Sequence, residues 1–161
     1  MEASAVALLL SPPVLALLGL CIGSFLNVVI HRLPLMLERG WRLDSAEMLG
    51  VKIDEPATIS LSKPRSRCPS CGHLIAWHEN IPVIGWLRLG GKCAACKTKI
   101  SVRYPIVEIL TAVLFAAVGW RFGATPVALL WCGFVAVLVA LAGIDWDTTL
   151  LPDDLTLPLL W

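Results

Sequence analysis

The chain has 161 residues, of which 57% are hydrophobic and 16% are charged, and its mean hydropathy is +0.78. Soluble domains carry about 45–50% apolar and about 25% charged residues, so this composition excludes an ordinary soluble protein. It also excludes an intrinsically disordered chain, which requires the opposite bias. The net charge of +1 gives no indication of a nucleic-acid partner. The composition therefore indicates a protein whose solvent is the lipid bilayer.

The first apolar segment reaches residue 30. No charged side chain occurs between Ala3 and Ile30, and this length exceeds the roughly 20 residues that span a bilayer. A cleaved signal peptide has a basic beginning and a short apolar stretch that ends in small residues. Here the only early charge is Glu2. We therefore predict a retained transmembrane helix over residues 1–30.

A long polar loop, residues 31–103, follows this helix and contains four of the six cysteines. They form two C-x-x-C pairs separated by 21 residues, a spacing typical of zinc ribbons in which four thiolates surround one ion. The basic residues of this loop predict that it is cytoplasmic, and disulfide bonds are disfavoured there because thiols stay reduced. A thioredoxin-like redox motif is also disfavoured, because the βαβ pattern that it requires is missing. We predict a structural zinc module over about residues 64–100, with Cys68, Cys71, Cys93 and Cys96 as ligands.

Three further segments complete the expected topology: spans over residues 104–120 and 125–144, and the start of a fourth span over residues 155–161. All but one of the 13 basic residues lie between Arg32 and Arg103, and the exception is Arg121. Since cytoplasmic loops collect Lys and Arg, the loop is expected to be cytoplasmic and the N-terminus to lie on the outer side of the membrane. The predicted fold is an all-α integral membrane protein with a cytoplasmic zinc-ribbon-like loop.

Acidic residues gather in the segment 145–154, directly after the third span. An ionisable residue at the edge of a span is costly and often functional, which singles out Asp145. Asp145 and Asp147 cannot form a catalytic pair on one helix, because residues two apart point away from each other. Asp153 and Asp154 fit the capping position of the next helix. Glu108, inside the second span, fits a contact to a basic group, but a buried helix–helix hydrogen bond is favoured.

Several sequence landmarks occur in one order along the whole chain, and together they resemble the bacterial prepilin peptidases, also called type IV leader peptidases. The landmarks are Gly23-Ser24-Phe25-Leu26-Asn27-Val28-Val29-Ile30-His31-Arg32-Leu33-Pro34, CPSCG, GGKCAACK, Arg103-Tyr104-Pro105-Ile106-Val107-Glu108, and Ile144-Asp145 followed by Leu150-Leu151-Pro152-Asp153.

The resemblance implies an intramembrane aspartic endopeptidase of the bacterial inner membrane. Such enzymes remove the basic leader of prepilins and pseudopilins on the cytoplasmic side and then methylate the new N-terminus with S-adenosylmethionine. The resemblance places one catalytic aspartate at Asp145 and the second in a downstream Gly-x-Gly-Asp motif. It also matches the four cysteines to the zinc-binding insert of the bacterial enzymes. It leaves the roles of Glu108, Asp147 and Asp153 open.

No Gly-x-Gly-Asp occurs in the 161 residues. We therefore expect the chain to represent the N-terminal half of such an enzyme and to be inactive as a protease alone, since the dyad needs two carboxylates. No glycine-rich nucleotide loop assigns the S-adenosylmethionine site to residues. An alternative from another class is a non-enzymatic, membrane-anchored zinc module that recruits a partner through its basic loop.

Overall fold

The computed structural model describes residues 2–52 and 59–160. Residues 1, 53–58 and 161, which fall in the predicted first span, the loop and the fourth span, lie outside the described part. The elements in chain order are α1 (Glu2–Leu9), α2 (Pro12–Met48), the 3-10 helix η1 (Trp77–Asn80), α3 (Ile84–Arg88), α4 (Arg103–Phe122), α5 (Pro126–Thr148) and α6 (Asp153–Leu160).

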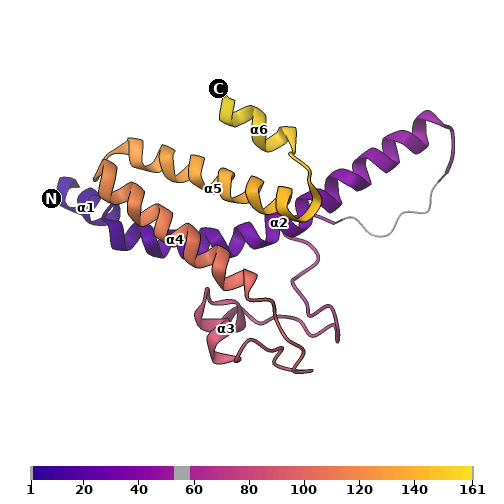
Figure 1. Cartoon of the computed structure of the whole chain (residues 1–161), viewed down its shortest axis with the longest axis horizontal. Helices are drawn as coiled ribbons and strands as arrows, with labels where there is room; N and C mark the ends of the chain where they lie inside the picture. The colour runs from indigo at the N-terminus through magenta and orange to yellow at the C-terminus, as the bar shows by residue number, and fades with distance from the viewer. Residues whose placement is uncertain (1, 53–58, 161) are drawn as a thin grey trace.

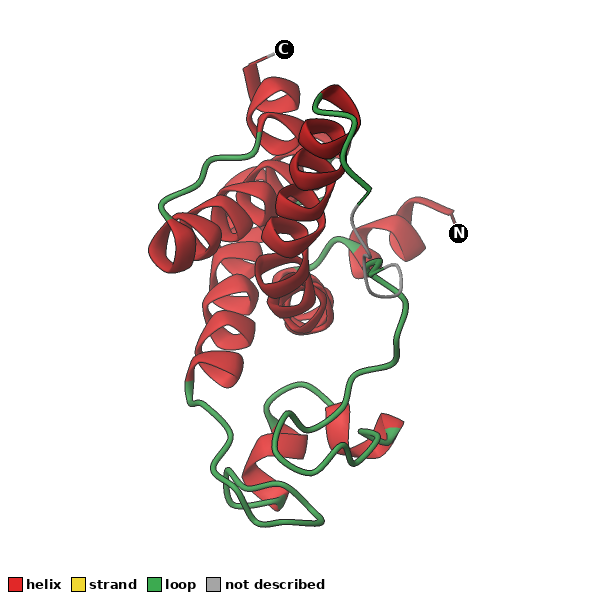
Figure 2. Ribbon diagram, turned by 90° about the vertical axis from the view of Figure 1, so that its right-hand side faces the viewer, coloured by secondary structure: helices red, strands yellow, loops and turns green. Residues whose placement is uncertain are grey.

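Three of these helices, α2, α4 and α5, are long and apolar enough to cross a membrane. They lie side by side as a bundle, and a loop-rich unit that carries α3 lies beyond the start of α4 (Figures 1 and 2). The described residues form isolated β-bridges, Arg67 with Leu74 and Lys92 with Lys99, but no strand. The predicted all-α fold with three candidate spans and a cysteine-bearing loop is confirmed.

Helix α2 is longer than the apolar segment that predicted it. It begins with Pro12, whose missing N–H is tolerated in a first turn, and it continues past Ile30 to Met48 with Pro34 inside. At about 1.5 Å per residue the helix is about 55 Å long, whereas the hydrocarbon core is about 30 Å thick. The segment 31–48 is therefore helical, and it projects away from the bundle (Figure 1). The polar residues His31 and Arg32 change the polarity of the helix without ending it.

The closest contact in the bundle joins α2 to α4 through two glycines. A Cβ atom added at Gly19 would lie 2.7 Å from the Cα of Ala112, and one added at Gly23 would lie 2.7 Å from the Cα of Glu108. Glycines four residues apart let two membrane helices approach backbone to backbone. Asn27, one turn further along α2, donates hydrogen bonds to the carbonyls of Gly23 and Tyr104. The two helices are thus antiparallel and fixed in register.

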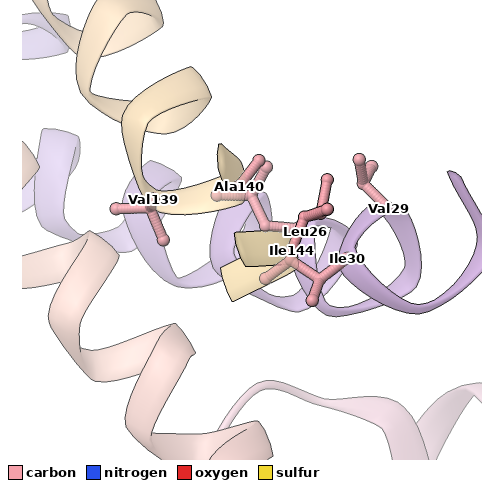
Figure 3. Close-up of a cluster of buried hydrophobic side chains, with 6 residues drawn as sticks. All are labelled: Leu26, Val29, Ile30, Val139, Ala140 and Ile144. Carbon is pink, nitrogen blue, oxygen red and sulfur yellow. The ribbon is translucent and has the colours of Figure 1, made fainter. Parts of the chain in front are cut away.

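Helix α5 packs against a neighbouring face of α2 through a cluster of buried apolar side chains. Figure 3 shows three residues from each helix in this cluster: Leu26, Val29 and Ile30 with Val139, Ala140 and Ile144. Ile30 is 1% and Ile144 0% exposed. A second cluster, at the opposite end of the bundle, contains Leu15, Phe115, Val118, Ala128 and Cys132. The position of Ile144 in the first cluster fixes the end of α5, where the acidic segment begins.

Candidate functional site

The two C-x-x-C pairs adopt the same backbone turn. In the first, the N–H of Cys68 donates to the carbonyl of His73 and the N–H of Gly72 donates to the carbonyl of Cys68, both at 2.9 Å. In the second, the N–H of Cys93 donates to Thr98 at 2.8 Å and the N–H of Lys97 donates to Cys93 at 3.1 Å. The fifth residue of each turn has a positive φ, +74° at Gly72 and +62° at Lys97.

These turns bring the four cysteine sulfurs together. All four Sγ atoms lie within 4.8 Å of one another, and the Sγ–Sγ distances are 3.8 Å for Cys68–Cys96 and 3.9 Å for Cys71–Cys93. A tetrahedral ion with metal–sulfur bonds of about 2.3 Å requires sulfurs about 3.8 Å apart, whereas a disulfide requires about 2.05 Å. All four cysteines are free thiols. The cluster therefore has the donors and the spacing to hold one thiophilic metal ion.

Histidines near the cluster have other partners. The Nε2 atom of His73 lies 3.2 Å from the Oε2 atom of Glu79, and the ring of His78 packs edge-on against Trp77. The Glu79 carboxylate also accepts the N–H of Ala76 at 3.0 Å, and this backbone hydrogen bond, with the neighbouring His73, lowers the pKa of Glu79. Both histidines thus belong to the framework of the loop.

The four cysteines have different surroundings, which give their thiols different pKa values. Hydrogen bonds from the hydroxyl and backbone of Thr98 lower the pKa of Cys96 to about 6, and backbone hydrogen bonds from Cys71 and Ser70 lower the pKa of Cys68. The backbone of His73 acts in the same direction on Cys71, but hydrogen bonds with Cys96 and the other thiols outweigh it and raise the pKa of Cys71 to about 11. The metal-free cluster thus shares protons unevenly, with Cys96 the readiest to become a thiolate.

The acidic segment lies where α5 ends near the beginning of α4. Asp147 accepts two hydrogen bonds, each of 2.6 Å, from the Nη1 atom of Arg103. Asp145, two residues earlier, is exposed, and its carbonyl accepts the N–H of Thr149, which ends the helix in a left-handed conformation. Both aspartates are thus exposed at the end of α5, and Asp147 forms an ion pair with Arg103.

An open groove of about 570 Å³ runs between α4 and α5 toward this end of the bundle. Its lining is apolar except for Arg103, and it includes Gly143 and Trp146, the residues on either side of Ile144 and Asp145. Asp145 is thus placed beside the end of an apolar groove, within the part of α5 that Ile144 anchors to α2.

Two polar contacts that hold the loop to the bundle were not recognised in the sequence. Glu108, 7% exposed, accepts the N–H of Val83 at 2.7 Å, so one of its partners is a backbone group of the loop. Arg32 donates to the carbonyls of Ser60, Leu61 and Pro64 at 2.7–3.3 Å. Only the position of Arg32, directly after the apolar segment, distinguishes it from the other basic residues of the loop.

Comparison with known proteins finds one matching family and several relatives that share one name. Residues 17–122 match the model of the bacterial peptidase A24 N-terminal domain. A prepilin leader peptidase/N-methyltransferase from Neisseria gonorrhoeae is 50% identical over 151 residues, which are 92% of this chain and 53% of that protein. The proteins of the same name from Pseudomonas aeruginosa and Aeromonas hydrophila are 51% and 52% identical, over 90% of this chain and 50% and 51% of their own length. The chain thus spans about half the length of the curated relatives it matches. No solved structure matches it significantly.

Proposed function

Since the chain belongs to the bacterial peptidase A24 N-terminal domain family, we propose that it acts as the N-terminal half of a prepilin leader peptidase/N-methyltransferase. The intact enzyme would cleave the leader of type IV prepilins and pseudopilins and then methylate the new N-terminus from S-adenosylmethionine. The observation that carries this proposal is about 50% identity over nine-tenths of the chain to relatives of that name, a range that includes the cysteine pairs. The expected setting is the inner membrane, with the cysteine loop on the cytoplasmic side.

In the peptidase reaction we assign Asp145 to the activation of water. An aspartic dyad holds one ionised carboxylate, which takes a proton from the attacking water, and one protonated carboxyl, which donates a proton to the leaving amide nitrogen. Asp145 and Asp147 are both exposed at this end of α5, but Asp147 is engaged by Arg103, so we assign the reaction to Asp145. The second carboxylate would come from a Gly-x-Gly-Asp motif, which these 161 residues do not contain.

A chimera tests this assignment directly. Residues 1–161 are joined to the remaining half of the Neisseria gonorrhoeae relative, and leader cleavage of a prepilin is followed by the shift in its mass. We expect cleavage by the chimera, none by the 161-residue chain alone, and at least a 10²-fold loss on Asp145→Asn, typical of removing a catalytic acid or base. Asp147→Asn is the matched control and should retain measurable cleavage. Normal processing by the Asp145→Asn chimera would refute the catalytic role.

For the cysteine cluster we propose a structural zinc ion bound by Cys68, Cys71, Cys93 and Cys96. The support is the donor set of four thiols and Sγ–Sγ distances that fit a tetrahedral site. The ion would tie the two turns together in a loop that has no strands among its described residues. Metal analysis of the purified chain should give about one zinc per chain, and Cys93→Ser should lower this ratio. A ratio near zero under reducing conditions would refute the site.

A further inference from the structure

The loop that carries the cysteines contains one strained turn. The N–H of Ile84 donates to the carbonyl of Pro82 at 2.5 Å, and Val83 between them has φ 60° and ψ −49°. These angles describe a classic γ-turn, a rare and strained conformation. A β-branched residue at positive φ is a genuine outlier, and such a conformation persists only where its surroundings enforce it.

A buried carboxylate of the bundle supplies this enforcement. The N–H of Val83 donates to the Oε2 atom of Glu108 at 2.7 Å, although the residues are 25 apart in sequence. Glu108 is 7% exposed and lies on α4 where Gly23 of α2 approaches its backbone. A buried carboxylate without a donor is in turn costly, so the turn and the carboxylate stabilise each other.

On its other side, the turn is connected to the cysteine cluster. It leads directly into α3 (Ile84–Arg88). There the indole of Trp86 donates to the carbonyl of Ile100 and packs on Gly91, which lies two residues before Cys93. The N–H of Ile100 also donates to the carbonyl of Gly91. A continuous chain of contacts therefore runs from Glu108 in the bundle to the second cysteine turn.

We propose that Glu108 is a positioning residue whose carboxylate holds the Pro82–Ile84 turn in place, docks the cysteine loop on the bundle and thereby slows metal release from the four-cysteine site. The docking stands on the geometry of Val83 and Glu108 alone. The effect on metal release rests on the zinc site proposed above. Because coupling between two sites is reciprocal in free energy, loss of the docking contact must weaken metal affinity if metal binding favours the docked loop. We expect this weaker affinity to be expressed as faster metal release.

Hydrogen exchange of the chain in detergent micelles measures docking without any metal or activity. Leaving a partly buried N–H without its acceptor corresponds to roughly a 10- to 100-fold faster opening, and we expect this increase for the Val83 amide in Glu108→Ala. Glu108→Gln retains an oxygen acceptor, so its Val83 amide should exchange at a rate between those of the parent chain and Glu108→Ala. Thr111→Ala is the matched control: Thr111 is 0% exposed and packs on Gly23 in the same helix interface, but its hydroxyl bonds to Val107. It should leave the Val83 amide unchanged.

A second variant tests the strain. Glycine adopts positive φ without a steric penalty, so Val83→Gly in the Glu108→Ala background should recover part of the lost protection. Equal exchange in Glu108→Ala and the parent chain would overturn the docking role, as would an equal increase in Thr111→Ala.

Zinc transfer to a chelator then tests the coupling. Glu108→Ala should release zinc several-fold faster than the parent chain, and Thr111→Ala at the parent rate. Faster exchange with unchanged zinc release would overturn the coupling to metal. A parent chain without zinc would refute the proposed zinc site, while the exchange comparison would still decide the docking role of Glu108.

Discussion

The backbone contact between α2 and α4 makes a sharp prediction for Gly23→Ala. The added Cβ atom would lie 2.7 Å from the Cα of Glu108, whereas ordinary contacts begin at 3.4 Å. Both atoms belong to rigid helices, so α2 and α4 must separate locally by about 0.7 Å or more. Overpacking of this kind costs about 1–3 kcal/mol, and the higher helix propensity of Ala returns up to about 1 kcal/mol. We expect a net loss of about 1–2 kcal/mol in the free energy of unfolding.

Gly133→Ala in α5 is the matched control, because a Cβ atom there meets nothing within 4 Å. This substitution changes propensity without a clash, so it should be neutral or stabilise by up to about 1 kcal/mol. The assay is reversible unfolding in mixed micelles of increasing SDS content, followed by tryptophan fluorescence and helical circular dichroism. The difference between the two variants isolates the clash and should be about 1–3 kcal/mol.

Gly19→Ala extends the test, because its Cβ atom would lie 2.7 Å from the Cα of Ala112 in the same interface. One separation of the helices relieves both clashes, so the double variant should lose less stability than the sum of the single losses. Equal stability of Gly23→Ala and Gly133→Ala would refute the close approach of α2 and α4.

Three further predictions concern individual contacts. In a double-mutant cycle of Arg103→Ala and Asp147→Ala, unfolding should give a coupling of about 0.2–1 kcal/mol, because both side chains are partly exposed; zero coupling would contradict the ion pair. In the metal-free chain at pH 7, above the pKa of about 6 for Cys96 and below that of about 11 for Cys71, iodoacetamide should label Cys96 before Cys71, as checked by peptide mass spectrometry. Asn27→Ala should lower the free energy of unfolding by about 0.5–1.5 kcal/mol in the SDS titration, because the buried Asn27 amide no longer donates its hydrogen bond to the carbonyl of Tyr104 on α4; an unchanged transition would contradict this bond.

The number and order of the membrane helices could be predicted from the sequence because they depend on composition alone. Uncharged stretches of sufficient length mark α2 and α5, and a single interruption by Glu108 leaves α4 recognisable. The grouping of the cysteines was also predictable, because two C-x-x-C pairs impose similar turns locally wherever the chain places them. Both predictions use information contained within a short segment.

The length of α2 was missed for a physical reason. Charges after Ile30 indicate where the chain leaves an apolar medium, whereas a helix ends only where its backbone hydrogen bonds are replaced. Pro34 removes one such bond and the helix continues to Met48. The partner of Glu108 was missed for another reason: the contact depends on a γ-turn at Val83 and on the close packing of Gly23. Valine does not favour a γ-turn, and Gly19 and Gly23 indicate a close helix contact without identifying the partner helix.

The uninterrupted course of α2 has a mechanical consequence for everything attached beyond residue 30. In a continuous α-helix the orientation of one end fixes that of the other, because each residue turns the chain by about 100° about the helix axis and advances it by about 1.5 Å along that axis. Gly19, Gly23 and Asn27 fix which face of α2 contacts α4. They therefore also fix the rotational orientation of the projecting segment that ends at Met48. A single residue inserted between Ile30 and Pro34 would swing that end about a quarter turn, while the packing before Ile30 stayed in place.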